Sequence, residues 1–303
     1  MAKRYILSVA GLGNSLLTAL ALNESKKDNN INDKIIINNS YAQTIFENIN
    51  GRETEFIRFR KIKSLKFILF LLKFIVHRKK IIIAEPNTSK NLILLMKILT
   101  LSKVNYQETI IHRSLEEEYN NLFKLEKKDK KKIQFKMDSS DYAVIYPTVE
   151  SVEKESKKIT ETQIESIIRY FEYIKIGYEI VIPEYEKYQL NTNFLRTYSE
   201  KIRYIKKFKN FEELTEYLNK FSIYIGSDTF YYNVMSKHLQ KKCYVVFGST
   251  SYKRIIYNRE NTKFVYPMCS NYPMYDKYFS KVKYCKECES KYCIDKLQID
   301  LKK

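Results

Sequence analysis

Short apolar runs, many of them ended by glycine or proline, recur along the chain and constrain its fold more than any other feature. They are "YILSVAG", "KIIIN", "IIIAEP", "YAVIYP", "YEIVIP", "FSIYIG" and "CYVVFG". Continuous apolar runs are typical of parallel strands, because helices cover both faces of a parallel sheet. Between the runs lie stretches such as "SLLTALALNESKK" and "TETQIESIIRYFEYIK", whose apolar residues recur at helical spacing. The alternation predicts an α/β fold with doubly wound parallel sheets.

The chain is long enough for two domains, and a charged segment marks the expected boundary between them. It has 303 residues, of which 44% are hydrophobic, and this content argues against a disordered chain. Residues 124–136, "KLEKKDKKKIQFK", carry no hydrophobic face before Ile133. Such a segment is either a linker or a solvated helix within one domain. We predict domains at 1–137 and 138–280, followed by a cysteine-containing tail at 281–303.

The net charge of +19 calls for a partner or substrate of opposite charge. Nucleic acid, an anionic membrane surface or a negatively charged substrate would account for it. The sequence has no recognisable zinc-finger spacing, aromatic RNA-binding pattern or helix-turn-helix pattern. Nucleic acid is therefore not expected as a partner, and a basic nucleic-acid-binding protein is the least favoured alternative.

The apolar segments of the chain indicate a cytoplasmic protein. The first residues, "MAKRYILSVAGLGNSLL", have a strand-and-turn pattern in place of a signal peptide. The longest apolar stretch is interrupted by Lys73 and is too short to span a bilayer. It lies within residues 60–80, which carry eight Lys/Arg and no acid. A basic helix of this type can lie on anionic lipid; alternatively, its apolar face packs on the first sheet.

Four of the six glycines follow predicted strands: Gly11 and Gly13 follow the first, and Gly226 and Gly248 follow two late ones. In open α/β sheets, ligands bind at the carboxyl ends of the strands, where turns expose backbone N–H groups. The glycines are therefore placed where an anionic ligand is expected, although tight turns need glycine for their own sake.

Five segments resemble, in order, glycosyltransferase family 9, the ADP-heptose:lipopolysaccharide heptosyltransferases. "ILSVAGLGNSLLTALAL" is similar to the opening strand, turn and helix of the family, and "IIIAEPNTSKNLILLMKILTLSKVNY" to an acceptor-domain strand and helix. "VIYPTVESVEKESKKITETQIESII" resembles the strand, loop and lysine that open the second domain. "GSDTFYYNVMSKHLQKKCYVVFGST" resembles the C-terminal signature, and "CKECESKYCIDKL" a cysteine-containing tail. The resemblance covers nearly the whole chain.

The resemblance implies a GT-B fold, in which two Rossmann-like domains face a cleft. It implies an inverting, metal-independent transfer of a sugar, heptose from ADP-heptose, to a lipopolysaccharide, lipooligosaccharide or other surface-glycan acceptor. The N-terminal domain would bind the acceptor and the C-terminal domain the nucleotide-sugar donor. The partners would be the ADP-sugar, a lipid-linked glycan and the anionic inner membrane, with the protein peripheral on its cytoplasmic face.

Lys157 is the residue that the resemblance places against the donor diphosphate. A lysine there would add positive charge beside the phosphates. Lys158 could serve instead, and either lysine could be a solvated surface residue. Thr148 follows the "VIYP" strand and could donate its hydroxyl to phosphate, or serve only in the turn. Gly13 is assigned to ligand binding at the edge of the first sheet.

Asp228, Thr229 and Phe230 are assigned to donor binding by the same resemblance. Asp228 or Thr229 could also be the N-cap of the next helix, and an N-cap can supply phosphate-binding N–H groups as well. Glu186 is a candidate for the nucleotide ribose, because a carboxylate accepts two hydroxyl hydrogen bonds. Glu184 is an equally suitable candidate for binding the ribose.

Asn14 is assigned to catalysis although it departs from the family pattern. It stands where heptosyltransferases often carry an aspartate proposed as general base. An amide cannot be a base, so Asn14 can only orient the acceptor hydroxyl or donate to developing charge. Phe230 and Asn233 replace a glycine and a histidine of the family signature. These departures raise the alternative of a catalytically impaired relative that binds a nucleotide sugar.

The last cysteines form a candidate structural metal site. Two residues separate Cys285 from Cys288, four separate Cys288 from Cys293, and Cys269 lies upstream. Four thiolates can hold zinc or iron tetrahedrally, with no position left open for catalysis. The alternative is that free cysteines pack the tail. Cys243 lies in a predicted strand and is expected in the core.

Overall fold

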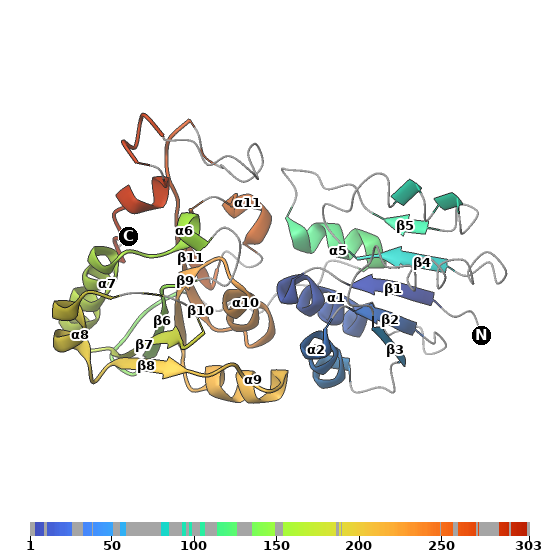
Figure 1. The fold of residues 1–303 in the computed structure, drawn as a ribbon, viewed down its shortest axis with the longest axis horizontal. Helices are drawn as coiled ribbons and strands as arrows, with labels where there is room; N and C mark the ends of the chain where they lie inside the picture. The colour runs from blue at the N-terminus through green and yellow to red at the C-terminus, as the bar shows by residue number, and fades with distance from the viewer. Residues whose placement is uncertain are drawn as a thin grey trace. The chain divides into compact units, whose positions relative to one another are not determined.

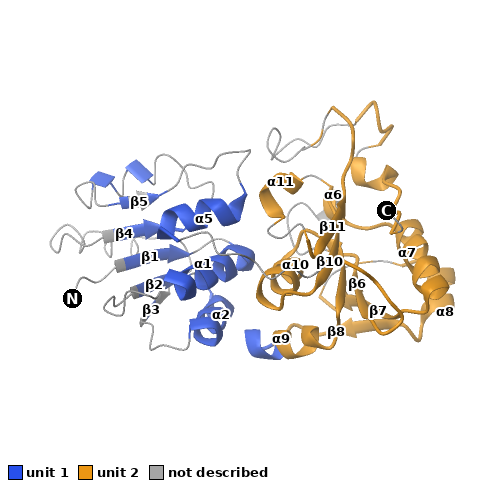
Figure 2. Cartoon of the chain, turned by 180° about the vertical axis from the view of Figure 1, so that it is seen from behind, with its two compact units in different colours: residues 1–129, 209–213 blue, residues 130–208, 214–303 orange. Residues whose placement is uncertain are grey.

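The computed structural model divides the chain into two compact units. The first comprises residues 1–129 and 209–213, and the second residues 130–208 and 214–303 (Figure 2). The residues described are 4–8, 11–25, 33–37, 39–50, 55–58, 80–84, 93–94, 97–98, 104–106, 114–125, 135–148, 154–185, 188, 190–248, 250–256, 260–270, 272, 285–290 and 292–301. The basic segment 60–80 lies outside them except for Lys80, which begins a strand.

The first unit is a parallel sheet with helices. Its five strands run in the order β3-β2-β1-β4-β5 (Figure 1). Their bounds are β1 (Arg4–Ser8), β2 (Asp33–Ile37), β3 (Glu55–Arg58), β4 (Lys80–Ile83) and β5 (Val104–Tyr106). Helix α1 (Leu12–Glu24) packs against α2 (Ser40–Asn50) and α5 (Leu115–Phe123). The isoleucines of β2 and β4 are buried, as expected for strands covered on both faces.

The second unit has six parallel strands in the order β11-β10-β9-β6-β7-β8. They are β6 (Tyr142–Tyr146), β7 (Gly177–Pro183), β8 (Ile202–Ile205), β9 (Ile223–Ser227), β10 (Lys242–Val246) and β11 (Thr262–Val265). The helices are α6 (Lys154–Lys157), α7 (Glu161–Ile174), α8 (Thr192–Tyr198), α9 (Phe211–Asn219, whose residues 211–213 are grouped with the first unit), α10 (Phe230–Asn233) and α11 (Tyr252–Ile255). A π-helix, η2 (Val234–His238), and a 3₁₀ turn, η3 (Cys293–Lys296), complete the unit.

Strand β6 lies at the topological switch point of the second sheet. It pairs with β7 on one side and with β9 on the other. The chain winds from β6 toward β8 and then returns to wind from β9 toward β11. Because the strand order reverses between β6 and β9, the loops at their carboxyl ends diverge and leave room for a ligand. The pair Tyr146↔Gly226 sets these two ends level with one another.

Helix α7 begins with a capping box that also contacts the C-terminal tail. Thr160 is the N-cap, and its side chain and that of Gln163 each pair with the other's backbone N–H. The buried residues of α7 include Ile164, Ile167 and Phe171, which belong to the core of the unit.

Among the described residues, no helix is both long and apolar enough to cross a bilayer.

Candidate functional site at the switch point of the second sheet

A buried ion pair lies at the switch point between β6 and β9. Lys157 is the last residue of α6, and its Nζ lies 2.9 Å from Oδ2 of Asp228. The two side chains are only 10% and 3% exposed. Burial of a lone ammonium or carboxylate would be costly, so each charge makes the other tolerable. Lys157 is therefore not the solvated surface lysine that was one alternative.

The neighbouring Lys158 points elsewhere. Its Nζ lies 4.6 Å from the centre of the Tyr188 ring, a cation–π contact. Of the two candidate lysines, the structure brings only Lys157 to Asp228.

Glycine and serine fix the backbone beside Lys157. The hydroxyl of Ser227, the last residue of β9, donates to the Lys157 carbonyl. A Cβ on Gly248 would lie 1.7 Å from the carbonyl oxygen of Ser156. Only glycine therefore lets α6 approach the end of β10 this closely. At Gly226, a Cβ would meet the hydroxyl of Tyr224 at 2.3 Å.

Thr229 has the N-cap role that was one of its two predicted roles. Its Oγ1 accepts from the backbone N–H of Tyr232 at 3.3 Å and lies 3.1 Å from the Tyr224 hydroxyl. Phe230 begins α10, is half-buried and packs edge-on against Tyr231. The helix continues as the π-helix η2, a form that is frequent at functional sites.

Three buried side-chain oxygens at neighbouring strand ends lack a hydrogen-bond partner among the described residues. They are Thr148 Oγ1 after β6, Asp228 Oδ1 after β9 and Thr250 Oγ1 after β10. Buried polar atoms in folded proteins are normally paired, so such a group calls for a ligand or water. Two hydroxyl donors, one carboxylate acceptor and an ammonium are a set that suits a sugar phosphate.

Asn14 and Gly13 lie at the corresponding switch point of the first sheet, between β1 and β4. Both are in the first turn of α1, after the N-cap Gly11. The Tyr119 hydroxyl donates to the carbonyl of Ala84 at 2.9 Å and lies 3.4 Å from the Asn14 carbonyl. Tyr119 therefore ties the end of β4 to the start of α1. The catalytic role of Asn14 stays a prediction.

Tyrosines at the ends of β6 and β7 were missed by the sequence analysis. The rings of Tyr146 and Tyr231 stack with centroids 4.2 Å apart, and the hydroxyls of Tyr185 and Tyr231 are 3.4 Å apart. Because the chain contains 26 tyrosines, no single one stands out in the sequence. Glu186 lies outside the described residues, whereas Glu184 is exposed at the end of β7.

The four late cysteines converge in the second unit. The sulfurs of Cys269, Cys285, Cys288 and Cys293 all lie within 4.8 Å of one another, and none is in a disulfide. Tetrahedral thiolates about 2.3 Å from a metal stand about 3.8 Å apart, so the cluster fits zinc or iron. A tight turn closed by Cys285 N–H to the Ser290 carbonyl, at 2.8 Å, presents two of the sulfurs.

Burial raises the pKa of the Cys288 thiol to about 11 and that of Cys293 further. The metal-free thiols therefore resist ionisation, and a cation would favour the thiolate forms.

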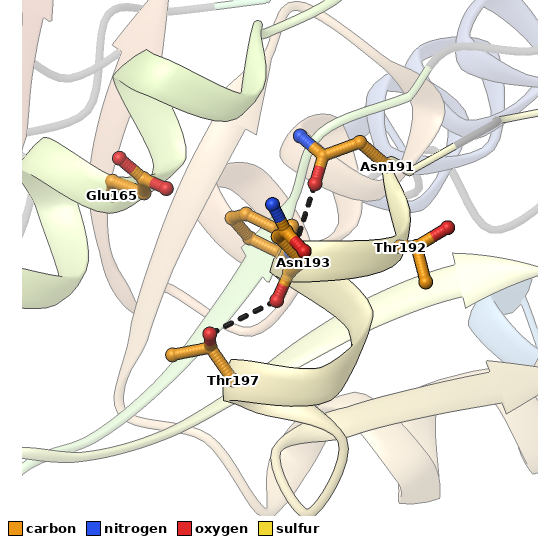
Figure 3. A pocket seen from close by; sticks show the side chains of 6 residues that line it. Glu165, Asn191, Thr192, Asn193 and Thr197 are labelled. Carbon is orange, nitrogen blue, oxygen red and sulfur yellow. Dashed lines mark hydrogen bonds between the residues drawn. The ribbon is translucent and has the colours of Figure 1, made fainter.

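A surface depression on α7 and α8 is a weaker candidate. It is lined by Glu165, Asn191, Thr192, Asn193, Phe194 and Thr197 (Figure 3). Asn191 Oδ1 accepts from the Phe194 N–H at 2.8 Å, and the Thr197 hydroxyl donates to the Asn193 carbonyl at 2.9 Å. These polar groups serve the local helix, so the depression has no convergent set for a ligand.

No protein-family model matches the sequence, and no curated protein sequence matches it. Solved structures do match. Escherichia coli heptosyltransferase WaaC with ADP has a TM-score of 0.54 at 15% identity, over 87% of this chain and 93% of that one. A family 9 glycosyltransferase from Veillonella parvula has a TM-score of 0.60 at 11% identity, over 96% and 94%. The iron-containing dodecameric glycosyltransferase TibC from E. coli has a TM-score of 0.52 at 8% identity, over 91% and 65%. The α/β prediction is confirmed, and the chain has the GT-B fold of the family 9 glycosyltransferases.

Proposed function

We propose that this chain is a family 9 glycosyltransferase that binds a nucleotide-sugar donor at the β6/β9 switch point. The observation that carries the proposal is the buried Lys157–Asp228 pair, with oxygens of Thr148, Asp228 and Thr250 at neighbouring strand ends that have no hydrogen-bond partner among the described residues. The ADP in the WaaC structure supports an ADP-sugar, with heptose as the proposed sugar. The proposed acceptor is a lipid-linked surface glycan.

Lys157 stabilises the departing diphosphate in the proposed reaction. The acceptor oxygen attacks the anomeric carbon from the face opposite the diphosphate, the bond to the diphosphate breaks, and the configuration inverts. An ammonium has three N–H donors, so Lys157 can bind phosphate oxygens while Asp228 holds it in place. Fixed positive charge at the leaving group lowers the barrier without reorganisation. The Thr148 hydroxyl adds a donor, and no metal takes part in the transfer.

The acceptor hydroxyl must lose a proton, and Asn14 does not take it. Its amide orients the hydroxyl, while a group with proton affinity accepts the proton.

Nucleotide binding by the second unit tests the proposal. ADP and ADP-sugars should raise the melting temperature, because a ligand that binds only the native state stabilises it. The double variant Lys157→Met/Asp228→Asn removes both charges without leaving a buried one alone, and it should abolish the shift. Lys158→Met is the control. Because Lys158 contacts the Tyr188 ring and not Asp228, this variant should bind ADP like the wild type. A lack of any shift with every nucleotide would refute the donor site.

A catalytically impaired relative is the second candidate, favoured by the half-buried Phe230 and by Asn14 and Asn233. ADP binding without hydrolysis or transfer from any labelled nucleotide sugar would select it over the enzyme.

We also propose that Cys269, Cys285, Cys288 and Cys293 hold a structural zinc or iron ion. The compact set of sulfurs and the iron in TibC support this. Elemental analysis should find about one metal ion per chain. Cys285→Ser/Cys288→Ser should lose it, and Cys243→Ala, a change in the core, should keep it. A metal-free wild type purified without chelators would contradict the assignment.

Peripheral attachment to the cytoplasmic face of an anionic membrane is proposed from the net charge of +19. The protein should sediment with vesicles that contain phosphatidylglycerol and not with pure phosphatidylcholine vesicles. High salt should release it, because the attraction is screened. Equal binding to both vesicle types would contradict the proposal.

A further inference from the structure

The cysteine cluster is joined to the segment that carries Lys157. Cys293 begins η3, and the next residue, Ile294, is fully buried in the core of the second unit. Turn η3 packs directly against α6. A residue next to a cysteine of the cluster thus lies beside the helix that ends at Lys157.

Gln163 ties the tail to the end of the loop after α6. Its Nε2 donates to the carbonyls of Ile294, at 2.7 Å, and Leu297, at 2.8 Å. Its Oε1 accepts from the Thr160 N–H at 2.9 Å. Gln163 is only 5% exposed. The buried Gln163 amide therefore bonds to residues near the start and at the end of η3 as well as to the N-cap of α7. Helix α7 begins four residues after Lys157.

Helix α6 contacts η3 and also lies close to Gly248, two residues beyond β10. A Cβ on Gly248 would lie 1.7 Å from Ser156 O and 3.3 Å from Ile294 Cδ1. Ser156 and Ile294 thus both lie close to Gly248. Ile294 therefore lies where it can support the α6 backbone just before Lys157.

We propose that the cysteine cluster positions the donor-binding lysine: a metal ion bound by the four sulfurs fixes η3, and Ile294 and Gln163 then hold α6 against β10. The metal ligands need not touch the donor. Ile294 and Gln163 are positioning residues, and donor affinity depends on the metal through them. The donor part of this inference rests on the proposed function, whereas the ordering of α6 does not. Because such coupling is reciprocal, ADP should tighten metal binding by the factor by which metal tightens ADP binding.

Hydrogen exchange tests the ordering of α6 without any donor. The full-length metal-loaded protein is compared with the same protein after chelation and with Cys285→Ser/Cys288→Ser. Amide exchange should accelerate in residues 154–163 and 293–297 when the metal is absent. Residues 115–123 of α5, in the other unit, should not change. Faster exchange confined to 293–297, or no change in either segment, would overturn the proposal.

Calorimetry with ADP tests the consequence for the donor. Removal of the metal should weaken ADP binding by about 10-fold or more. Ile294→Ala should weaken it similarly while the protein keeps its metal. Leu301→Ala is the matched control, since Leu301 is a buried tail residue of the same core and should leave ADP affinity unchanged. Equal ADP affinity with and without metal would overturn the coupling. If the loaded protein does not bind ADP at all, the proposed function fails, and the exchange measurement still decides whether the cluster orders α6.

Discussion

At the scale of single residues, Gly248 is the glycine whose replacement by a larger residue would cause the closest contact among the glycines described. Gly248→Ala would place a methyl group within 1.7 Å of the Ser156 carbonyl, which is backbone and cannot rotate away. We expect a loss of about 2–3 kcal/mol in the free energy of unfolding of the second unit, as for an overpacked core. Urea unfolding measures it. Gly11→Ala is the control, because a Cβ there meets nothing within 4 Å and costs only about 1 kcal/mol at a helix N-cap. Equal losses in both variants would contradict the prediction.

The second residue-scale prediction concerns the buried charge of Lys157. Asp228→Ala removes its carboxylate partner and should cost about 3–5 kcal/mol, because the ammonium would remain buried without the opposite charge. Arg203→Ala breaks a salt bridge whose arginine side chain is 49% exposed, so it should cost about 1 kcal/mol or less. Urea midpoints of the two variants provide the comparison. A similar small loss in both would show that Lys157 reaches water once its partner is gone.

The sequence predicted the location of these residues better than their contacts. Strand patterns placed Thr148 and Asp228 at carboxyl ends, and the structure puts both at one switch point. That Lys157 and Asp228 pair with one another could not be predicted, because 71 positions separate them and no local pattern encodes the contact. The role of Tyr119 in joining β4 to α1 could not be predicted either, because no sequence pattern around it indicates these contacts.

At the scale of elements, the capping box of α7 can be compared with the capping box of α5. Gln163→Leu should cost about 2–4 kcal/mol, since the Thr160 N–H loses its side-chain acceptor and the carbonyls of Ile294 and Leu297 are left without their donor. The box of α5, formed by Ser114 and Glu117, is exposed, so Glu117→Ala, which removes the acceptor of the Ser114 N–H, should cost about 0.5–1 kcal/mol. Limited proteolysis should cut the C-terminal tail of Gln163→Leu first. Resistance equal to that of the wild type would contradict this role.

The strands divide clearly into those the sequence predicts and those it does not. All seven quoted apolar runs correspond to interior strands, and the four missed strands, β3, β5, β8 and β11, are the four sheet edges. An edge strand pairs on one side only, and β8 and β11 each have one buried residue. Their apolar runs are therefore interrupted. The helix predicted over "FYYNVMSKHL" begins as α10 but continues as a π-helix, which helical spacing does not distinguish.

At the scale of the whole molecule, the order of strands follows from general rules once their number is known. Right-handed crossovers and a single reversal give β3-β2-β1-β4-β5 in the first unit and a like order in the second. The cysteine cluster depends on more than order, because Cys269 must meet three sulfurs from the tail. Sequence spacing predicted a thiolate set but could not predict that η3, which begins at Cys293, packs against α6.

The last prediction concerns alkaline pH and the many buried tyrosines. Burial raises the pKa of Tyr244 to about 12 and moves those of Tyr178, Tyr188 and Tyr272 still higher. Unfolded tyrosines titrate near pH 10, so above that pH the unfolded chain binds fewer protons than the folded one. The tyrosine contribution to stability is then complete below about pH 10 and is lost as pH rises toward about 12. Unfolding free energies measured from about pH 8 to 11.5 should fall, with tyrosinate absorbance appearing as the chain unfolds. Tyr244→Phe should flatten that fall, because it removes one linked proton, while the loss of lysine charge affects both proteins alike. A slope identical to that of the wild type would show that Tyr244 ionises without unfolding.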